Sequence, residues 1–202
     1  MSSARSSANR TWLRAGIITA VGIATISLAG LVTAQTSKPA AETKGSADRG
    51  KHLVFLGGCN DCHTPLIMTA SGPRPDSTRY LSGHPSGLKL PPPPALDMNW
   101  MAAASATMTA WAGPWGISYT ANLTPDSTGL GIWTEQLFMQ AMRSGKHLGV
   151  GRPIMPPMPI EEMGKLSDQE LKDVWAFLRT IPPVHNQVPE YLPPTGAPGG
   201  QH

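Results

Sequence analysis

The strongest constraint on this chain is a run of five residues, Cys59-Asn60-Asp61-Cys62-His63. Two thiols are separated by two residues, an imidazole follows at once, and the 202 residues contain no other cysteine. Thiols at this spacing can add to the two vinyl groups of a haem, and the adjacent imidazole can then bind the iron. The motif therefore predicts one covalently bound haem c, held by Cys59 and Cys62, with His63 as the proximal iron ligand.

From the motif alone, three other interpretations of the cysteine pair stand beside haem attachment. The thiols could form a small structural disulfide, act as a thiol-redox pair, or ligate zinc. A thiol-redox pair is typical of a thioredoxin-like βαβ pattern, and the sequence has no alternating strand runs. A closed zinc site needs two further ligands, and the sequence has neither a second cysteine pair nor two histidines at zinc-finger spacing.

The N-terminus has the pattern of an export signal. Residues 1–14 carry three arginines and no acidic residue, and residues 15–34 are apolar and small, with a small-x-small ending at Ala34. We expect residues 1–34 to be a signal peptide cleaved after Ala34, although about 20 apolar residues can also serve as a membrane anchor. Either way, the body of the protein is expected to be exported, as a periplasmic protein or a membrane-anchored protein that faces the periplasm.

The charge balance argues against a nucleic-acid partner. The chain has 16 Lys and Arg against 13 Asp and Glu, and three of the arginines lie in the predicted leader. Without those three, the remainder has 13 basic and 13 acidic side chains, so its net charge is zero. The sequence therefore lacks the basic surface with which proteins bind nucleic acid.

The remaining residues are enough for one domain. We expect a polar linker over 35–46, the domain over 47–184, and a Pro/Gly-rich tail over 185–202 that is extended or disordered. Within the domain, residues 64–120 form a long irregular insertion rich in Pro and Gly, which is expected to wrap the core or a cofactor. A short helix over 102–112 is the one regular element that we expect there.

Three segments outside the insertion have helical patterns. Ser46 is a suitable N-cap for a helix over 47–57 that ends at two glycines. A second helix is expected over 134–145, with Thr134 as its N-cap and Gly145 at its end. The last helix begins at a capping box formed by Ser167 and Glu170, and its apolar residues repeat at helical spacing until a proline pair ends it.

A haem iron with one His ligand usually takes Met, His or an open site opposite it. The loop Gly151–Pro159 contains two methionines among four prolines, and a stiff backbone lowers the ordering cost of placing a weak thioether ligand. Met158, with proline on both sides, is our first choice for the distal ligand, and Met155 is the second. Both methionines could instead fill the core. The other histidines are expected to be solvated: His52, His84, His147, His185 and His202.

With these motifs the chain resembles the small monohaem c-type cytochromes of the class I fold, in the exported cytochrome c family of bacteria. The resemblance covers most of residues 47–190. Its matching stretches are Arg49-Gly50-Lys51, Gly58-Cys59-Asn60-Asp61-Cys62-His63-Thr64-Pro65, Asn122-Leu123-Thr124-Pro125-Asp126, Gly129-Leu130-Gly131-Ile132-Trp133-Thr134, Pro156-Pro157-Met158-Pro159 and the last helix through Pro182-Pro183.

The resemblance implies an all-α fold, with cytochrome c-like helices around one covalently bound haem and residues 64–120 as a long irregular insertion. It implies that the first and last helices cross near Gly50 and an aromatic residue of the last helix, here Trp175. It also favours Met158 as the distal iron ligand.

These expectations lead to one functional prediction and two alternatives. We expect an electron carrier, not an enzyme, whose haem iron has His63 and Met158 as axial ligands. It would pass electrons between exported or membrane-bound redox partners, such as a dehydrogenase or a terminal oxidase. The first alternative is a haem subunit of a membrane dehydrogenase or oxidase complex. The second is an open-site haem protein with catalytic or gas-binding activity.

Overall fold

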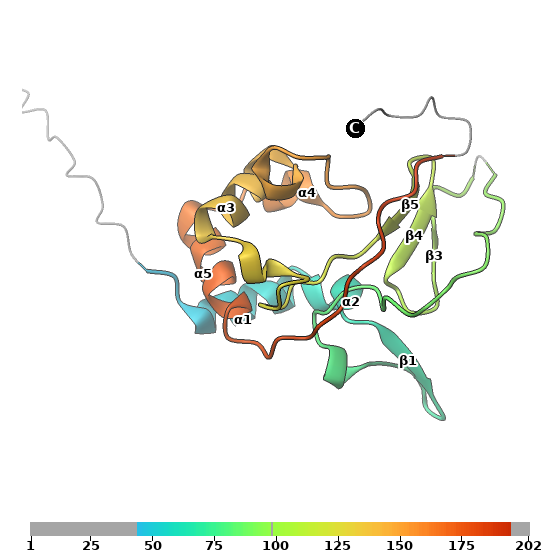
Figure 1. Cartoon of the computed structure of the whole chain (residues 1–202), viewed down its shortest axis with the longest axis horizontal. Helices are drawn as coiled ribbons and strands as arrows, with labels where there is room; N and C mark the ends of the chain where they lie inside the picture. The colour runs from blue at the N-terminus through green and yellow to red at the C-terminus, as the bar shows by residue number, and fades with distance from the viewer. Residues whose placement is uncertain (1–43, 98, 195–202) are drawn as a thin grey trace, which may run out of the picture. The chain divides into compact units, whose positions relative to one another are not determined.

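The computed structural model describes residues 44–97 and 99–194 of the chain (Figure 1). Its α-helices are α1 (Ala47–Leu56), α2 (Cys59–His63), α3 (Glu135–Ser144), α4 (Ile160–Met163) and α5 (Asp168–Leu178). Its strands are β1 (Leu66–Thr69), β2 (Gly72–Pro75), β3 (Ala103–Ala104), β4 (Ala110–Gly113) and β5 (Gly116–Tyr119). Short 3-10 helices are η1 (Ser77–Arg79), η2 (Leu130–Ile132) and η3 (His147–Gly149). The predicted leader and residues 195–202 lie outside the described part, and within that part no helix is both long and apolar enough to span a membrane.

The prediction of an all-α fold is wrong, because two small antiparallel sheets lie between α2 and α3. One is the hairpin β1–β2, and the other has the strand order β3–β4–β5. Both lie in the predicted irregular insertion, and β3, a turn and most of β4 replace the helix expected over 102–112. The side chains of β4 alternate between buried and half-buried, as in a strand with one face on the core. Strands of two to four residues are too short for this alternation to be recognised in the sequence.

The three longer helices are confirmed, and each begins at its predicted cap. Ser46 Oγ accepts a hydrogen bond from the Arg49 N–H (3.4 Å) at the start of α1. Thr134 Oγ1 accepts one from the Leu137 N–H (3.2 Å) at the start of α3. The predicted capping box at Ser167 is formed at the start of α5. These side chains satisfy N–H groups that the first helical turn leaves unpaired.

α1 and α5 are packed with almost no space between their backbones at Gly50. A Cβ atom at this position would lie 1.8 Å from the carbonyl oxygen of Asp173 and 2.9 Å from Cβ of Phe177. The predicted crossing at Gly50 is therefore confirmed, but Phe177 takes the place expected for Trp175. Trp175 packs instead on Phe138 of α3, with 5.6 Å between the ring centroids.

A buried carboxylate joins the start of α1 to α5. The side chain of Asp173 is fully buried, and its Oδ1 accepts a hydrogen bond from the Ser46 N–H (2.6 Å). Its Oδ2 pairs with Arg49 at 2.6 Å. Burial by itself raises the pKa of this carboxyl, but hydrogen bonds from Ser46, Gln169 and Arg49 outweigh burial and leave the pKa below its ordinary value. The carboxylate is therefore charged at neutral pH and holds the two helices together.

The C-terminal segment is extended, as expected for a Pro/Gly-rich tail, but contacts hold it against the body of the protein. Figure 1 shows this segment, in red, running from α5 past α2 to β5. There Ile117 and Leu192 exchange two backbone hydrogen bonds, of 2.8 and 2.9 Å. Gly116 permits this approach, because a Cβ there would lie 2.1 Å from the Leu192 carbonyl oxygen. Residues 183–192 are called the C-terminal strap below.

Replacing Gly50 with alanine should destabilise the fold, because the new methyl group overlaps the backbone of α5. We expect Gly50→Ala to lower the free energy of unfolding by about 2–3 kcal/mol, measured by chemical denaturation. Gly87→Ala is the matched control, because a Cβ at Gly87 meets nothing within 4 Å. It should change the stability by less than about 0.5 kcal/mol. Equal stability of the two variants would show that α1 and α5 are not in close contact at Gly50.

Candidate haem-binding site

α2 is a single helical turn that places the two thiols on one side. Cys59 and Cys62 are three residues apart, so they lie on the same face of this turn. Gly58 precedes α2 with φ 64° and ψ 21°, a left-handed conformation that glycine adopts without strain. This glycine allows the chain to end α1 and begin α2 with only two residues between them.

Both thiols are half-buried and free. Burial raises the pKa of Cys59 to about 11, and burial followed by the charge of Asp61 raises the pKa of Cys62. Both sulfur atoms therefore keep their protons at neutral pH. A thiol-redox pair depends on a lowered thiol pKa, so the raised values argue against that alternative. They do not argue against haem attachment, in which a vinyl group takes up both the sulfur and the proton of the thiol.

His63 ends α2 with a buried ring whose two nitrogens are in different states. The residue is 8% exposed, and Nδ1 lies 2.7 Å from the carbonyl oxygen of Ala121. A carbonyl oxygen only accepts hydrogen bonds, so Nδ1 carries the ring proton and Nε2 carries the lone pair. Burial lowers the pKa of His63 against the opposing effect of the Ala121 bond, which keeps the ring neutral at neutral pH. Nε2 of His63 is therefore able to bind a metal ion.

Two segments distant in sequence hold the end of α2. In the segment 81–84, the Gly83 N–H donates to the carbonyl oxygen of His63 (2.7 Å). The segment 120–123 supplies the Ala121 carbonyl that holds the ring. Two backbone hydrogen bonds, of 3.0 and 2.9 Å, join the two segments to each other. The position of the His63 ring therefore depends on how both segments are held.

The methionine loop, residues 151–159, lies between η3 and α4 and is held at two points. The Ile154 N–H donates to the carbonyl oxygen of Gly145 at the end of α3 (2.8 Å). Further along, Ser118 Oγ of β5 donates to the carbonyl oxygen of Pro156 (2.5 Å). These bonds and the restricted backbone of the prolines limit the conformations of the loop between the end of α3 and the sheet.

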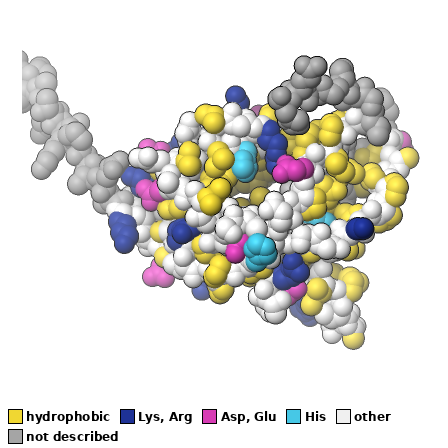
Figure 2. Space-filling view, viewed as in Figure 1, with side chains coloured by type: hydrophobic (Ala, Val, Ile, Leu, Met, Phe, Trp, Pro, Cys, Tyr) yellow, Lys and Arg dark blue, Asp and Glu magenta, His cyan; other side chains and the backbone are white. Residues whose placement is uncertain are grey.

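The residues of α2 and of the methionine loop include the donors that the predicted cofactor needs. Figure 2 shows a hollow in one face of the described part, with hydrophobic atoms deep in it. Met155 and Met158 are both half-buried. Free thiols, an imidazole lone pair and thioethers are the donors that a haem c requires, so the residues present fit this cofactor.

The remaining histidines differ from expectation at one position. His84 is fully buried and not solvated, because Thr109 and Tyr119 cover its ring. Its Nδ1 lies 3.0 Å from the hydroxyl oxygen of Thr109, and its ring packs on Tyr119 with 4.9 Å between centroids. The described histidines that are exposed, as expected, are His52, His147 and His185. His202 lies outside the described residues.

Three buried polar residues around this site were not predicted from the sequence. Asn122, Thr124 and Asn186 are at most 3% exposed. A local signal existed for the first two, because an asparagine side chain often bonds the backbone two residues further on and forms a turn. Here Asn122 Oδ1 accepts a hydrogen bond from the Thr124 N–H (3.0 Å). No local signal distinguishes Asn186 from any polar residue of a Pro-rich tail.

The chain is similar to components of known dehydrogenases. One of the subunits of nicotinate dehydrogenase from Pseudomonas putida is 33% identical over 143 residues, which cover 70% of this chain and 9% of that protein. The fructose dehydrogenase cytochrome subunit of Gluconobacter japonicus is 27% identical over 154 residues, which cover 75% of this chain and 25% of that protein. The alcohol dehydrogenase (quinone) cytochrome c subunit of Gluconobacter oxydans is 26% identical over 146 residues, which cover 70% of this chain and 23% of that protein.

These similarities support a protein of the cytochrome c type. They also bear out the prediction that the chain is not itself an enzyme, since two of the relatives are named as the cytochrome subunit of a dehydrogenase. The chain spans a quarter or less of the length of each of these relatives. No protein-family model matches the chain.

Burial of His84 should make the fold sensitive to acid. Burial lowers the pKa of His84 in the folded protein below its ordinary value of 6.5, against the opposing effect of a hydrogen bond to Leu88, whereas the unfolded chain keeps the ordinary value. Below pH 6.5 the unfolded chain therefore binds the proton more readily, so the free energy of unfolding falls as the pH falls towards the lowered pKa. We expect His84→Gln to flatten the stability curve between about pH 7 and pH 5, measured by urea denaturation.

The exposed His52 provides the control for this measurement. His52→Gln should leave the slope of stability against pH unchanged. A slope that is the same in the wild type and in His84→Gln would show that His84 titrates equally in the folded and unfolded states, contrary to its burial.

Proposed function

We propose that the protein is an electron-transfer protein that holds one haem c through Cys59 and Cys62. The arrangement of α2 carries this proposal: two free thiols share one face, and the adjacent His63 directs its Nδ1 proton to Ala121 and keeps its Nε2 lone pair. Two relatives named as cytochrome subunits give independent support.

The chain's own residues would hold and orient the cofactor. When bound, the haem supplies a one-electron couple between ferrous and ferric iron. Cys59 and Cys62 would fix the ring through thioether bonds, and neutral His63 would bind the iron through Nε2. The Ala121 carbonyl would keep the imidazole in one orientation and raise its basicity as a ligand.

We propose Met158 as the distal ligand, with Met155 as the alternative. Prolines on both sides of Met158 restrict its backbone, and the bonds from α3 and β5 hold the loop. Little ordering then opposes a weak thioether bond. With two protein side chains on the iron, no position is open to a substrate or a gas, which favours electron transfer over the open-site alternative.

We propose a dehydrogenase as the redox partner, with a terminal oxidase as the alternative. The names of its relatives support this proposal, because they describe subunits of nicotinate, fructose and alcohol dehydrogenases. Phe55 and Leu56 are 71% and 66% exposed and lie a few residues before Cys59. Exposed apolar side chains close in sequence to the attachment motif suit brief docking through a small interface.

We propose that residues 1–34 direct export, either as a cleaved leader or as a retained anchor, and that residues 35–46 link this leader to the domain over 47–184. The basic start and apolar stretch of the leader support the proposal. Export would place the haem and its redox partners in the periplasm or at its membrane.

The full chain, expressed in a host that matures c-type cytochromes, should carry covalent haem. The haem should stay with the polypeptide after denaturation and give the pyridine haemochrome spectrum of two thioether bonds. Replacing both Cys59 and Cys62 with alanine should abolish covalent attachment, because no other thiol is present. Asn60→Ala, between the thiols, is the control and should retain the haem. A wild-type chain without covalent haem would contradict the proposal.

Met158→Ala should remove the distal ligand, whereas Met155→Ala should leave it in place. Loss of the thioether should lower the midpoint potential, measured by a redox titration followed by absorption spectra. It should also allow carbon monoxide to bind the reduced protein, measured as the change in the reduced spectrum when the gas is added. The reverse result, with the ligand lost only in Met155→Ala, would assign Met155. Ready binding of carbon monoxide by the wild type would support the open-site alternative.

A further inference from the structure

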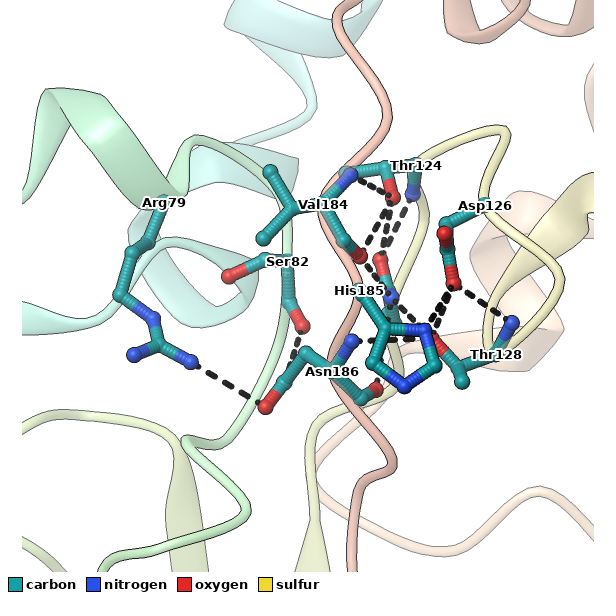
Figure 3. A network of polar contacts seen from close by, with 9 residues as sticks. Arg79, Ser82, Thr124, Asp126, Thr128, Val184, His185 and Asn186 are labelled. Atoms are coloured by element: carbon teal, nitrogen blue, oxygen red, sulfur yellow. Dashed lines mark hydrogen bonds and ion pairs between the residues drawn. The ribbon is translucent and has the colours of Figure 1, made fainter.

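The C-terminal strap is fixed at its centre by one buried asparagine (Figure 3). Asn186 is 1% exposed, and its side-chain amide makes four hydrogen bonds with the segment 79–86. Since these bonds use both N–H donors and both lone pairs of the amide, no other neutral side chain of this size replaces it. The partners are Ser82 O (2.7 Å), His84 O (2.9 Å), Ser86 N (2.9 Å) and Arg79 Nη2 (3.2 Å).

A second set of bonds ties the strap to the turn before η2. Asn122 donates from its side-chain amide to the carbonyl oxygen of Val184 (2.9 Å) and to Thr128 Oγ1 (3.1 Å). The same Thr128 oxygen accepts from the Asn186 N–H (2.9 Å), and its hydroxyl proton is donated to Asp126 (2.6 Å). The Thr128 hydroxyl therefore joins the strap, Asn122 and the turn at one atom. Figure 3 shows its bonds to Asn186 and Asp126.

The two segments that the strap holds are the two that hold His63. Asn186 bonds the segment 81–84 on either side of Gly83, whose N–H donates to the His63 carbonyl oxygen (2.7 Å). Asn122 follows Ala121 in the chain, and the Ala121 carbonyl oxygen is bonded to the His63 ring (2.7 Å). A displacement of Asn122 by the strap would therefore move the carbonyl that orients the imidazole.

We propose that the C-terminal strap positions the iron ligand: Asn186, Asn122 and the Thr128 hydroxyl hold the Ala121 carbonyl, and this carbonyl holds the His63 imidazole. The redox part of this inference rests on the proposed function. The three residues are positioning residues, because they act on His63 through the backbone at Ala121 and Gly83. The strength of the bond at Nδ1 sets how basic the imidazole is as a ligand, so the strap would also tune the iron.

Thr128→Val tests this inference, because it removes the hydroxyl and keeps the shape of the side chain. In the full, haem-loaded chain, Thr128→Val should speed hydrogen exchange of the Gly83 amide and of the His63 Nδ1 proton by roughly 2- to 10-fold, as expected for the loss of a partly buried hydrogen bond. Both protons are followed by NMR of the reduced protein.

Two variants serve as controls. Thr128→Ser keeps the hydroxyl and should restore wild-type exchange at both protons. Thr180→Val removes a hydroxyl that donates to Phe177 O at the end of α5 (2.7 Å), so it controls for a general loss of stability and should leave both protons protected.

The midpoint potential gives a reading that a merely structural role would not change. It should rise in Thr128→Val, because a weaker bond at Nδ1 makes the imidazole a poorer donor to ferric iron. Thr128→Ser and Thr180→Val should keep the wild-type potential. An unchanged potential with an unchanged exchange rate of the His63 proton in Thr128→Val would overturn the proposal, even if the strap itself became looser.

If Thr128→Val does not fold, hydrogen exchange of the wild type under mild denaturant makes the same test. The Asn186 amide, the Gly83 amide and the His63 Nδ1 proton should exchange through one common opening. Opening of Asn186 in a separate event that leaves the His63 proton protected would overturn the proposal. A failure of the proposed function would be recognised separately, because the wild type would then carry no covalent haem. The exchange rate of the Gly83 amide in Thr128→Val and in Thr128→Ser would still test whether the strap holds the segment 81–84.

Discussion

The hydrogen bond between His63 Nδ1 and the Ala121 carbonyl is the contact on which the candidate site depends. A histidine next to two cysteines can bind iron only if one ring nitrogen keeps its lone pair and faces away from competing donors. Ala121 decides which nitrogen this is, because a carbonyl oxygen can only accept, and burial keeps the ring uncharged. The fold has to bring Ala121 to the ring across 58 residues of chain.

Two different kinds of packing frame this contact. On one side, α1 and α5 meet at Gly50, and the buried Asp173 holds the start of α1. α2 therefore follows a helix that is packed closely on its partner. On the other side, helices alone do not close the site. β5 supplies Ser118, which holds the methionine loop, and the strand edge on which the C-terminal strap pairs. The β3–β4–β5 sheet, which contradicts an all-α fold, is thus part of what holds the methionine loop and the C-terminal strap.

The longer helices could be predicted because their signals are local. A cap joins residues three apart, and an amphipathic pattern repeats within one or two turns, so both are present in a short stretch of sequence. The strands could not be predicted, because two to four residues do not establish an alternation. His84 was misjudged for a different reason: its glycine-rich neighbours suggest a solvated loop, but Thr109 and Tyr119, which lie much further along the chain, cover its ring.

The candidate chemistry followed from the sequence by itself: two thiols and an imidazole within five residues, a methionine between prolines, and the basic and apolar pattern typical of an export signal over residues 1–34. Each of these depends only on residues that are close together in the chain. Only the tertiary structure decided which nitrogen of His63 keeps its lone pair, why both thiols keep their protons, and that Asn186 belongs to the site and not to a free tail. Burial and hydrogen-bond partners arise from segments far apart in sequence, and only folding brings those segments together.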